Sequence, residues 1–329
     1  MRLDLGGQPI HTRALSVVVE QRERSALHAA VDLLDLRKRG FAPVGSELQG
    51  AGIIHQMGLD ARIEDGILTD LRARQPVVAF EASAATRGES CRDVVAGLAA
   101  LVGLPLPDVA GQLRAVMGGA AGCSHLLAGA QYLCATLAEL APPVPSAAAL
   151  THRRLLRRDL ILDGSERDDG ALVIGVQLGD VRSRPAAATE RPGERFDSHY
   201  ELQLMVELRG WPATIAALEG AERRRTRADF ASAEWRDLHA HLAPLAGASL
   251  GKGGAQRLTA ALASHAAARD ALLQLAPALI QCRASFPDKW LNAAMTTCGH
   301  DGLIAMADSC YMWRGDGALA LIRTEREPA

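Results

Sequence analysis

Two stretches of the chain alternate apolar and polar residues with a period of two. Their apolar positions are Met57, Leu59, Ala61 and Ile63 in the first stretch, and Tyr200, Leu202, Leu204, Val206 and Leu208 in the second. A period of two is that of a β-strand with one buried face. The pattern therefore predicts one half-buried strand in each half of the chain.

The same order of signals surrounds both strands. Each half begins with a His-Thr-Arg or His-Arg-Arg triplet, at residues 11–13 and 152–154, and continues with an apolar segment that contains an aspartate. A shift of 145 positions superposes three pairs of residues: Asp35 on Asp180, His55 on Tyr200 and Met57 on Leu202. The apolar faces of the two strands stay in phase under this shift, which favours an internal duplication over two unrelated halves.

Helical patterns follow the strands in each half. The predicted helices cover residues 91–101, 106–117 and 124–140, and then 234–245, 255–264 and 266–282. Strands followed by helices are typical of the α+β class. We expect two related α+β units, each a small antiparallel sheet followed by packed helices, which together form a pseudo-dimer. The alternative is two ordinary α+β domains whose similarity comes only from their common class.

A Pro/Ala-rich segment at residues 142–149 is the predicted linker between the units. The first unit then covers residues 1–141 and carries the candidate site. The second covers residues 150–329 and includes a C-terminal extension. We expect this second unit to close the site as a structural partner, because it has no counterpart of the polar residues described next.

A glycine-rich turn at residues 118–122 leads into the long apolar helix and places Cys123 at the N-cap. Free backbone N–H groups and the helix dipole favour a thiolate at such a position. The sequence thus predicts that Cys123 is more reactive than Cys134, which lies deeper in the same helix. A small buried cysteine without a chemical role is the alternative.

His55 shares the parity of the apolar strand positions and therefore points inward. His125 lies in the first turn of the helix that packs on this sheet, so we expect His55 and His125 to converge on one cavity with Cys91 and Cys123 on its wall. Two satisfied core histidines are the alternative. The four side chains also offer nitrogen and sulfur donors of the kind that zinc prefers, but their spacing is not that of a usual metal motif, so no cofactor is predicted and zinc stays open.

Composition and charge restrict the functional classes. Of 329 residues, 48% are hydrophobic, and 36 basic residues are balanced by 38 acidic ones, which argues against a nucleic-acid partner. The most apolar stretch, residues 94–107, is shorter than the roughly 20 residues that span a bilayer, so no membrane is expected. Six cysteines without a Cys-x-x-Cys pair and the lack of a leader pattern predict free thiols and a cytoplasmic protein. A homodimer stays open.

Several of these motifs resemble a known family. His55-Gln56-Met57, Cys91 and the Gly-Cys-Ser-His-Leu run at 122–126 are similar to segments of the bacterial family catalogued as domain of unknown function 2889. The resemblance covers about residues 50–140, together with the C-terminal segment 308–320. Gln56 stands where the family has an aspartate. The resemblance supports the choice of residues and implies no established activity.

Taken together, the sequence predicts an enzyme that acts on a small substrate of the aromatic or acyl class. His55 and His125 would carry out acid–base chemistry of the lyase or hydrolase type, with Cys123 as nucleophile or oriented donor and Cys91 beside it. The sequence contains no nicotinamide fingerprint. The alternative is a non-catalytic metal-binding, ligand-binding or assembly protein that uses the same His/Cys cluster.

Overall fold

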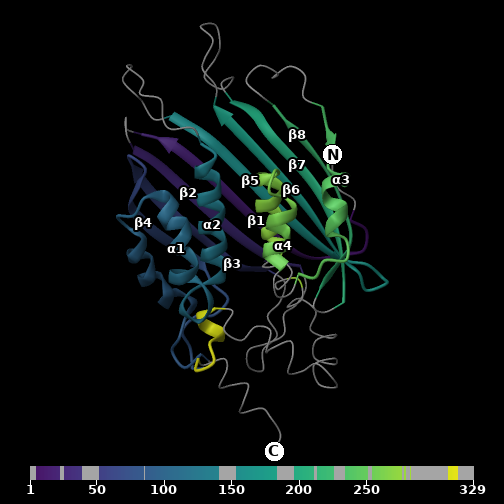
Figure 1. Ribbon diagram of the computed structural model, residues 1–329. Coiled ribbons are helices and arrows are strands. Elements are labelled where there is room, and N and C mark those ends of the chain that lie inside the picture. Colours follow the sequence, from purple (N-terminus) through teal and green to yellow (C-terminus); the bar gives the residue numbers. More distant parts are fainter. Residues whose placement is uncertain are drawn as a thin grey trace, which may run out of the picture.

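Nine antiparallel strands form one twisted sheet that crosses the whole protein in the order β4-β3-β2-β1-β5-β6-β7-β8-β9 (Figure 1). The strands are β1 (Gln8–Gln21), β2 (Ala26–Arg37), β3 (Gly52–Glu64), β4 (Ile67–Val77), β5 (Arg153–Glu166), β6 (Leu172–Ser183), β7 (Phe196–Arg209), β8 (Thr214–Arg224) and β9 (Arg236–Asp237). This computed structural model describes residues 5–22, 26–38, 52–84, 86–140, 153–183, 196–210, 213–225, 234–250, 254–275, 278, 282 and 310–317.

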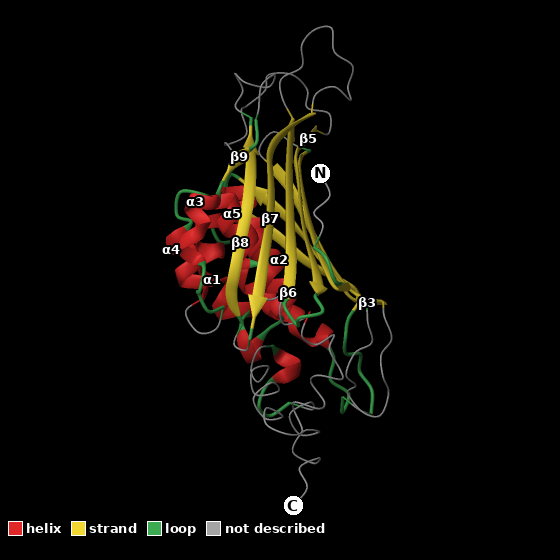
Figure 2. Ribbon diagram, turned by 90° about the vertical axis from the view of Figure 1, so that its right-hand side faces the viewer, coloured by secondary structure: helices red, strands yellow, loops and turns green. Residues whose placement is uncertain are grey.

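The helices gather on one face of the sheet (Figure 2). The α-helices are α1 (Leu106–Met117), α2 (Ser124–Ala138), α3 (His239–Leu242), α4 (Gly254–Ala261) and α5 (Ala266–Leu273). Short 3₁₀ helices are η1 (Cys91–Leu101), η2 (Gly119–Ala121), η4 (Ala243–Leu245) and η6 (Tyr311–Trp313). The hydrophobic core lies between the helices and the covered face.

Buried and exposed residues alternate along the strands, which explains why the helices cover one face of the sheet. In β1, Leu15, Val17 and Val19 are buried while the residues between them are more exposed, and β7 repeats the pattern with Leu202 and Leu204. A strand with one apolar face must cover that face, and amphipathic helices do so. The two strands predicted from the period of two are confirmed as β3 and β7.

The two halves share one sheet, because β1 pairs directly with β5. Leu15 faces Leu160 at the centre of this ladder, and on both sides residues equidistant from this pair face each other, from His11 opposite Gly164 to Val19 opposite Leu156. The prediction of two separate small sheets is therefore wrong. Once β1 and β5 pair along their length, the two small sheets become a single surface without an edge between them.

The ladders repeat one arginine–aspartate pairing in both halves at a constant spacing. Arg13 pairs with Asp35 between β1 and β2, and Arg158 pairs with Asp180 between β5 and β6, so the shift between these pairs is 145 positions. The register also skips one residue of the next strand directly after each aspartate. The predicted match between the triplets at 11–13 and 152–154 is thus wrong, since it implies a different shift.

Some predicted boundaries hold and others do not. The helices at 91–101 and 106–117 are confirmed, the first as a 3₁₀ helix, and α2 ends two residues earlier than predicted. Within 234–245 a short strand precedes α3, because Arg236 and Asp237 pair with β8. α5 ends at Leu273 with a turn at Gln274, and the next described residues, Leu275, Ala278 and Cys282, are again helical. The linker predicted at 142–149 lies outside the described residues.

The C-terminal segment 310–317 packs on the first half of the chain. The Tyr311 N–H donates to the Gly122 carbonyl at 2.7 Å, Arg314 forms an ion pair with Glu89, and Trp313 meets the edge of Phe80. The expectation that this segment extends the second unit is therefore corrected for its described part.

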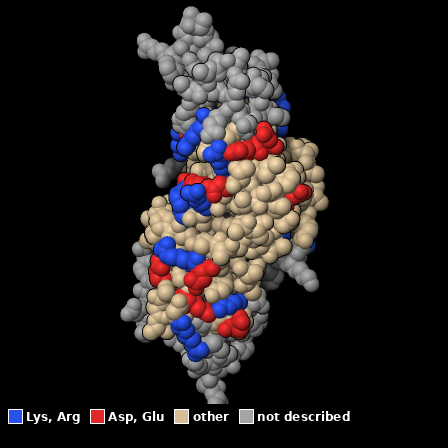
Figure 3. All heavy atoms as spheres, turned by 90° about the vertical axis from the view of Figure 1, so that its left-hand side faces the viewer, with Lys and Arg blue, Asp and Glu red and all other residues tan. Residues whose placement is uncertain are grey.

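Acidic and basic side chains are interspersed over the molecule's face at the β4 end (Figure 3). Arg74 forms ion pairs with Asp60 at 2.6 Å and with Asp32 at 3.0 Å, and Arg72 pairs with Asp70. Charged side chains along an edge strand discourage pairing with another chain. Within the described residues, no helix combines the length and apolar character needed to span a membrane.

Candidate functional site

A row of three polar residues crosses β1, β2 and β3 on the covered face of the sheet. Arg13 pairs with Asp35 in one ladder, and Asp35 pairs with His55 in the next. All three side chains are buried, and so are the polar side chains of His11 and Arg37, the next residues on this face of β1 and β2. Polar groups in such a place require partners, so their mutual contacts define the site.

Arg13 and Asp35 form a bidentate pair at the centre of this row. Nε and Nη2 of Arg13 donate to the two carboxylate oxygens at 2.8 Å each, and neither side chain is exposed. Burial alone would raise the pKa of Asp35, but the charge and hydrogen bonds of Arg13 hold this pKa well below its usual range. Asp35 is therefore an anion at neutral pH.

Three imidazoles surround the Asp35 carboxylate. His11 Nε2 lies 3.2 Å from Oδ1, whereas His55 Nδ1 and His125 Nε2 lie 3.5 Å and 3.4 Å from Oδ2. The His55 and His125 rings lie against each other with centroids 3.8 Å apart and planes tilted by 31°. His125 reaches this place from the first turn of α2. The predicted convergence of His55 and His125 is thus confirmed.

The three histidines are neutral in the folded protein. Burial lowers the pKa of His11 and of His55, and the nearby Asp35 charge only partly opposes this effect. The pKa of His125 is lowered further, by burial and by the neighbouring His55. A neutral imidazole has a free lone pair, so each can accept a proton or bind a metal.

The cysteines behave differently from the prediction. Cys123 is the N-cap of α2, as expected, and its Sγ lies 4.0 Å from His125 Nδ1. Burial nevertheless raises the pKa of the Cys123 thiol to about 11, because desolvation outweighs the helix-start N–H groups. Burial raises the pKa of Cys134 to about 11 as well, and that of Cys91 to about 12. The predicted thiolate at Cys123 is therefore wrong.

Cys91 begins η1, where Ser90 provides a capping box, and the nearby Cys123 and Cys310 add to the effect of burial in raising the pKa of its thiol. Among the described residues, the donor atoms that lie within metal-binding reach of one another belong to Asp35, His55 and His125, all within 4.8 Å. The cysteines are not part of this group. A zinc site would therefore use Asp35 in place of the two thiols considered from the sequence.

His11, Arg13 and Asp35 were not predicted as site residues from the sequence. All three entered the comparison of the two halves, but only as markers of position. The available signal was their burial parity: residues 11 and 13 share the parity of Leu15 and Val17, and a charged residue at an inward position of a strand requires a partner.

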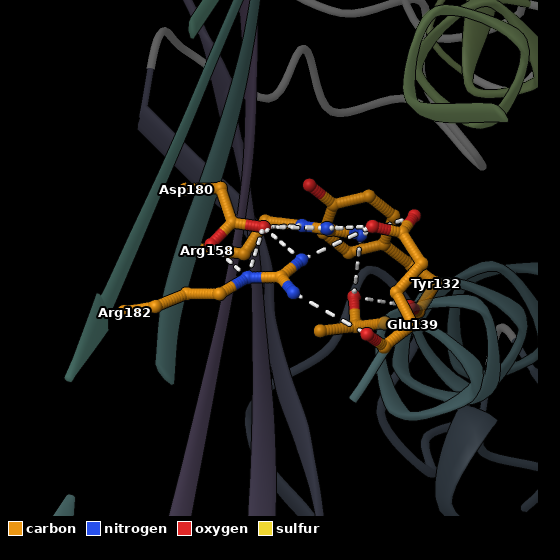
Figure 4. Close-up of polar contacts among 6 residues, drawn as sticks. Tyr132, Glu139, Arg158, Asp180 and Arg182 are labelled. Atoms are coloured by element: carbon orange, nitrogen blue, oxygen red, sulfur yellow. Dashed lines mark hydrogen bonds and ion pairs between the residues drawn. The ribbon is translucent and has the colours of Figure 1, made fainter. Parts of the chain in front are cut away.

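A second buried polar cluster lies on β5 and β6, where α2 ends (Figure 4). Arg158 donates to Asp180 through Nε at 3.2 Å and Nη2 at 2.6 Å, and Arg182 contacts the same carboxylate. Glu139, just after α2, accepts from Arg158 Nη2 at 2.6 Å and from Arg182 Nη2 at 3.2 Å. The expectation that only the first half keeps a buried polar group is thus corrected.

The two clusters share the Arg–Asp pair and differ in the histidines. Tyr200 occupies the place of His55 and donates to Glu222 at 2.9 Å, while Leu156 occupies the place of His11. The repeated Arg–Asp pair is explained by the fold, since each partner neutralises the other in the core. Three imidazoles surround Asp35 in the first cluster, whereas in the second half His199 lies close enough to Arg182 and Asp180 for their charges to affect its pKa, and His265 Nδ1 lies 3.8 Å from Glu222.

The fold and the site define a mixed α/β protein with a buried histidine–aspartate cluster on a continuous antiparallel sheet. Residues 11–139 match the model of the family described as "Protein of unknown function (DUF2889)". The match begins at His11 and ends at Glu139, so it includes Arg13 and Asp35, the buried ion pair of the first cluster. No curated protein and no solved structure matches the chain.

Proposed function

We propose that the protein is an enzyme of the lyase or hydrolase type that acts on a small aromatic or acyl substrate by acid–base chemistry. The observation that carries the proposal is the adjacent pair His55 and His125, held neutral and buried against one ionised carboxylate, Asp35. A neutral imidazole oriented by a carboxylate is an effective general base, because the carboxylate stabilises the imidazolium that forms.

Asp35 faces Nδ1 of His55 and Nε2 of His125. This arrangement leaves His55 Nε2 as the nitrogen that meets a substrate proton. His125 Nδ1 lies toward Cys123, so the thiol orients the second ring. With a thiol pKa near 11, Cys123 is a poorer nucleophile than the imidazoles are bases, and we assign it the orienting role.

We also infer that the two halves arose by internal duplication. The constant shift of 145 positions across the ladders, the repeated Arg–Asp pair and the repeated register skip support this origin. The second half then keeps the structural pair and supports the sheet, while the first half carries the chemistry. The free thiols among the described cysteines support a reducing, cytoplasmic location.

The test uses neutral p-nitrophenyl esters of acetate, butyrate and benzoate as probes of hydrolysis. We compare the wild-type protein with His55→Gln and with Tyr200→Phe, a change at the equivalent position of the other half. General-base catalysis contributes on the order of 100-fold or more, so His55→Gln should lose at least that factor while Tyr200→Phe retains the rate. Equal rates in all three proteins, or no turnover above buffer with any ester, contradict the proposal.

A metal-binding protein is the second candidate, favoured by the distances between donors. Zinc at about 2.0–2.1 Å from each tetrahedral ligand places ligand atoms roughly 3.3–3.4 Å apart, close to the 3.4 Å and 3.5 Å that separate Asp35 from His125 and His55. The bidentate Arg13 opposes this function, because a cation already occupies both carboxylate oxygens. Elemental analysis after dialysis against zinc decides: stoichiometric zinc that disappears in His55→Gln supports the metal site.

A further inference from the structure

The second half of the chain brings two histidines together on the helix side of β8. His241 lies on α3, and His265 is the N-cap of α5. Their rings lie against each other with centroids 4.4 Å apart and planes tilted by 54°. Both helices belong to the group that packs on the sheet near β8 (Figure 2). The packing of separate helices therefore creates a pair of imidazoles outside the first cluster.

A buried carboxylate stands beside this pair. Glu222 of β8 is buried, and its Oε1 lies 3.8 Å from Nδ1 of His265. The other oxygen, Oε2, accepts from the Tyr200 hydroxyl at 2.9 Å and lies 3.5 Å from Nε of Arg224. Tyr200 and Arg224 thus hold one oxygen of the carboxylate, while the other oxygen faces the imidazole.

This carboxylate favours one form of the His265 ring. Nδ1 of His265 is buried and has no hydrogen-bond partner among the described residues, although 14% of the whole side chain is exposed. A proton on Nδ1, directed at Glu222, leaves the lone pair of the neutral ring on Nε2. A histidine that binds a metal usually donates its other ring N–H to a carboxylate, which orients the ring and makes the ligating nitrogen more basic.

The separation of the rings suits one shared ion. Two imidazoles that bind one ion at about 2.0–2.1 Å place their ring centroids about 4.5–5 Å apart, close to the observed 4.4 Å. His241 is exposed, so water can reach the ion and complete its coordination. Among the described residues, three donor atoms all within 4.8 Å of one another occur in the first cluster and not here. Glu222 is therefore not a third ligand and acts through His265.

The charge around Glu222 opposes a cation less than the charge around Asp35 does. In the first cluster, Arg13 donates to both oxygens of Asp35, so a cation already occupies the carboxylate. Arg224 contacts only Oε2 of Glu222, and not the oxygen that faces His265. A positive ion at the second pair of imidazoles thus keeps a carboxylate oxygen on its side.

We propose that His241 and His265 bind a divalent transition-metal ion of the class that imidazole ligands suit, zinc, copper or nickel, and that Glu222 is the positioning residue that orients His265. The site uses no residue of the first cluster and does not depend on the proposed acid–base function. Its open coordination positions are of the kind that exchange water for a further ligand.

The test is isothermal titration of the tag-free, full-length protein with zinc chloride. His241→Gln and His265→Gln should each weaken zinc binding at least tenfold, and Glu222→Gln should weaken it about 10- to 100-fold. His239→Gln is the matched control, because His239 lies in the same helix but lines a different cavity with Asp237, and the zinc Kd should stay unchanged. His55→Gln should also keep this zinc, which distinguishes the site from the first cluster.

Spectroscopy with Cu²⁺ as the probe gives a second readout. Electron paramagnetic resonance should show two nitrogen ligands in the wild-type protein and one in His241→Gln. Since His241 is exposed, this variant decides the question even if His265→Gln does not fold. Zinc binding that is absent from the wild-type protein, unchanged in His241→Gln, or weakened equally in His239→Gln overturns the site. An unchanged zinc Kd in Glu222→Gln overturns the positioning role.

Discussion

Arg13 of β1 and Asp35 of β2 are directly opposed in the ladder, and both oxygens of the carboxylate accept from the guanidinium at 2.8 Å in a place without solvent exposure. Every chemical group of the first cluster is arranged around this pair. A substitution that breaks the Arg13–Asp35 ion pair should therefore lower the free energy of unfolding, in addition to any effect on activity.

Asp35→Asn should destabilise the protein by about 3–5 kcal/mol, because it leaves the Arg13 charge buried without a counter-ion while it keeps the side-chain shape. Urea denaturation measures the difference in the free energy of unfolding. Asp70→Asn is the control, since Asp70 pairs with Arg72 on the exposed part of β4 and should cost less than about 1 kcal/mol. Equal losses in the two variants would show that the buried pair has no special role.

Stability should fall as the pH drops from about 7.5 to 5.5. The unfolded histidines titrate near pH 6.5, whereas burial lowers the pKa of His11, His55 and His125 in the folded protein. Below about pH 6.5 the unfolded chain therefore binds protons that the folded protein does not, and each histidine contributes a slope of up to about 1.4 kcal/mol per pH unit. The lowered pKa of Asp35 acts only at more acidic pH, below the usual range of a carboxyl group.

Urea titrations at several pH values measure this slope, and His55→Gln should reduce it by up to one histidine's share. A slope that is the same in wild type and in His55→Gln would mean that His55 titrates alike in both states.

Iodoacetamide at about pH 7.5 should label Cys123 and Cys134 slowly in the folded protein. The pKa of each thiol is raised to about 11 by burial, so the reactive thiolate is scarce. Mass-spectrometric mapping after timed labelling measures the rates, and the same reaction in urea gives the rate of the exposed thiols. Fast, selective labelling of Cys123 would contradict this prediction and support the reactive Cys123 that the sequence predicts.

Tyr132→Phe should be neutral or slightly stabilising, because the Tyr132 hydroxyl is buried and has no hydrogen-bond partner within the described residues. Tyr200→Phe should cost about 1–2 kcal/mol, since it removes the hydrogen bond to the buried Glu222. Thermal melts of the two variants give a direct comparison of the same chemical change. A larger loss in Tyr132→Phe would indicate a partner for that hydroxyl.

The sequence by itself determined the local elements. The period of two in β3 and β7 and the cysteine at the start of α2 depend on residues close together in the chain, so pattern and propensity sufficed to predict them. The 145-position shift required only a comparison of the two halves of the sequence. The inward direction of His55 followed from strand parity in the same way. The helix predicted to begin at residue 234 was wrong at its start, because Arg236 and Asp237 pair with β8. This pairing cannot be predicted from the local sequence pattern.

Only the tertiary structure decided what these elements form together. The pairing of Leu15 with Leu160 joins strands that are far apart in sequence, and it turns two predicted sheets into one. The meeting of Asp35, His55 and His125 depends on two ladders and the packing of α2 at once. Burial then set the protonation states: it kept the Cys123 thiol neutral where helix geometry alone favoured a thiolate, because desolvation depends on everything packed around a group and not on its neighbours in the chain.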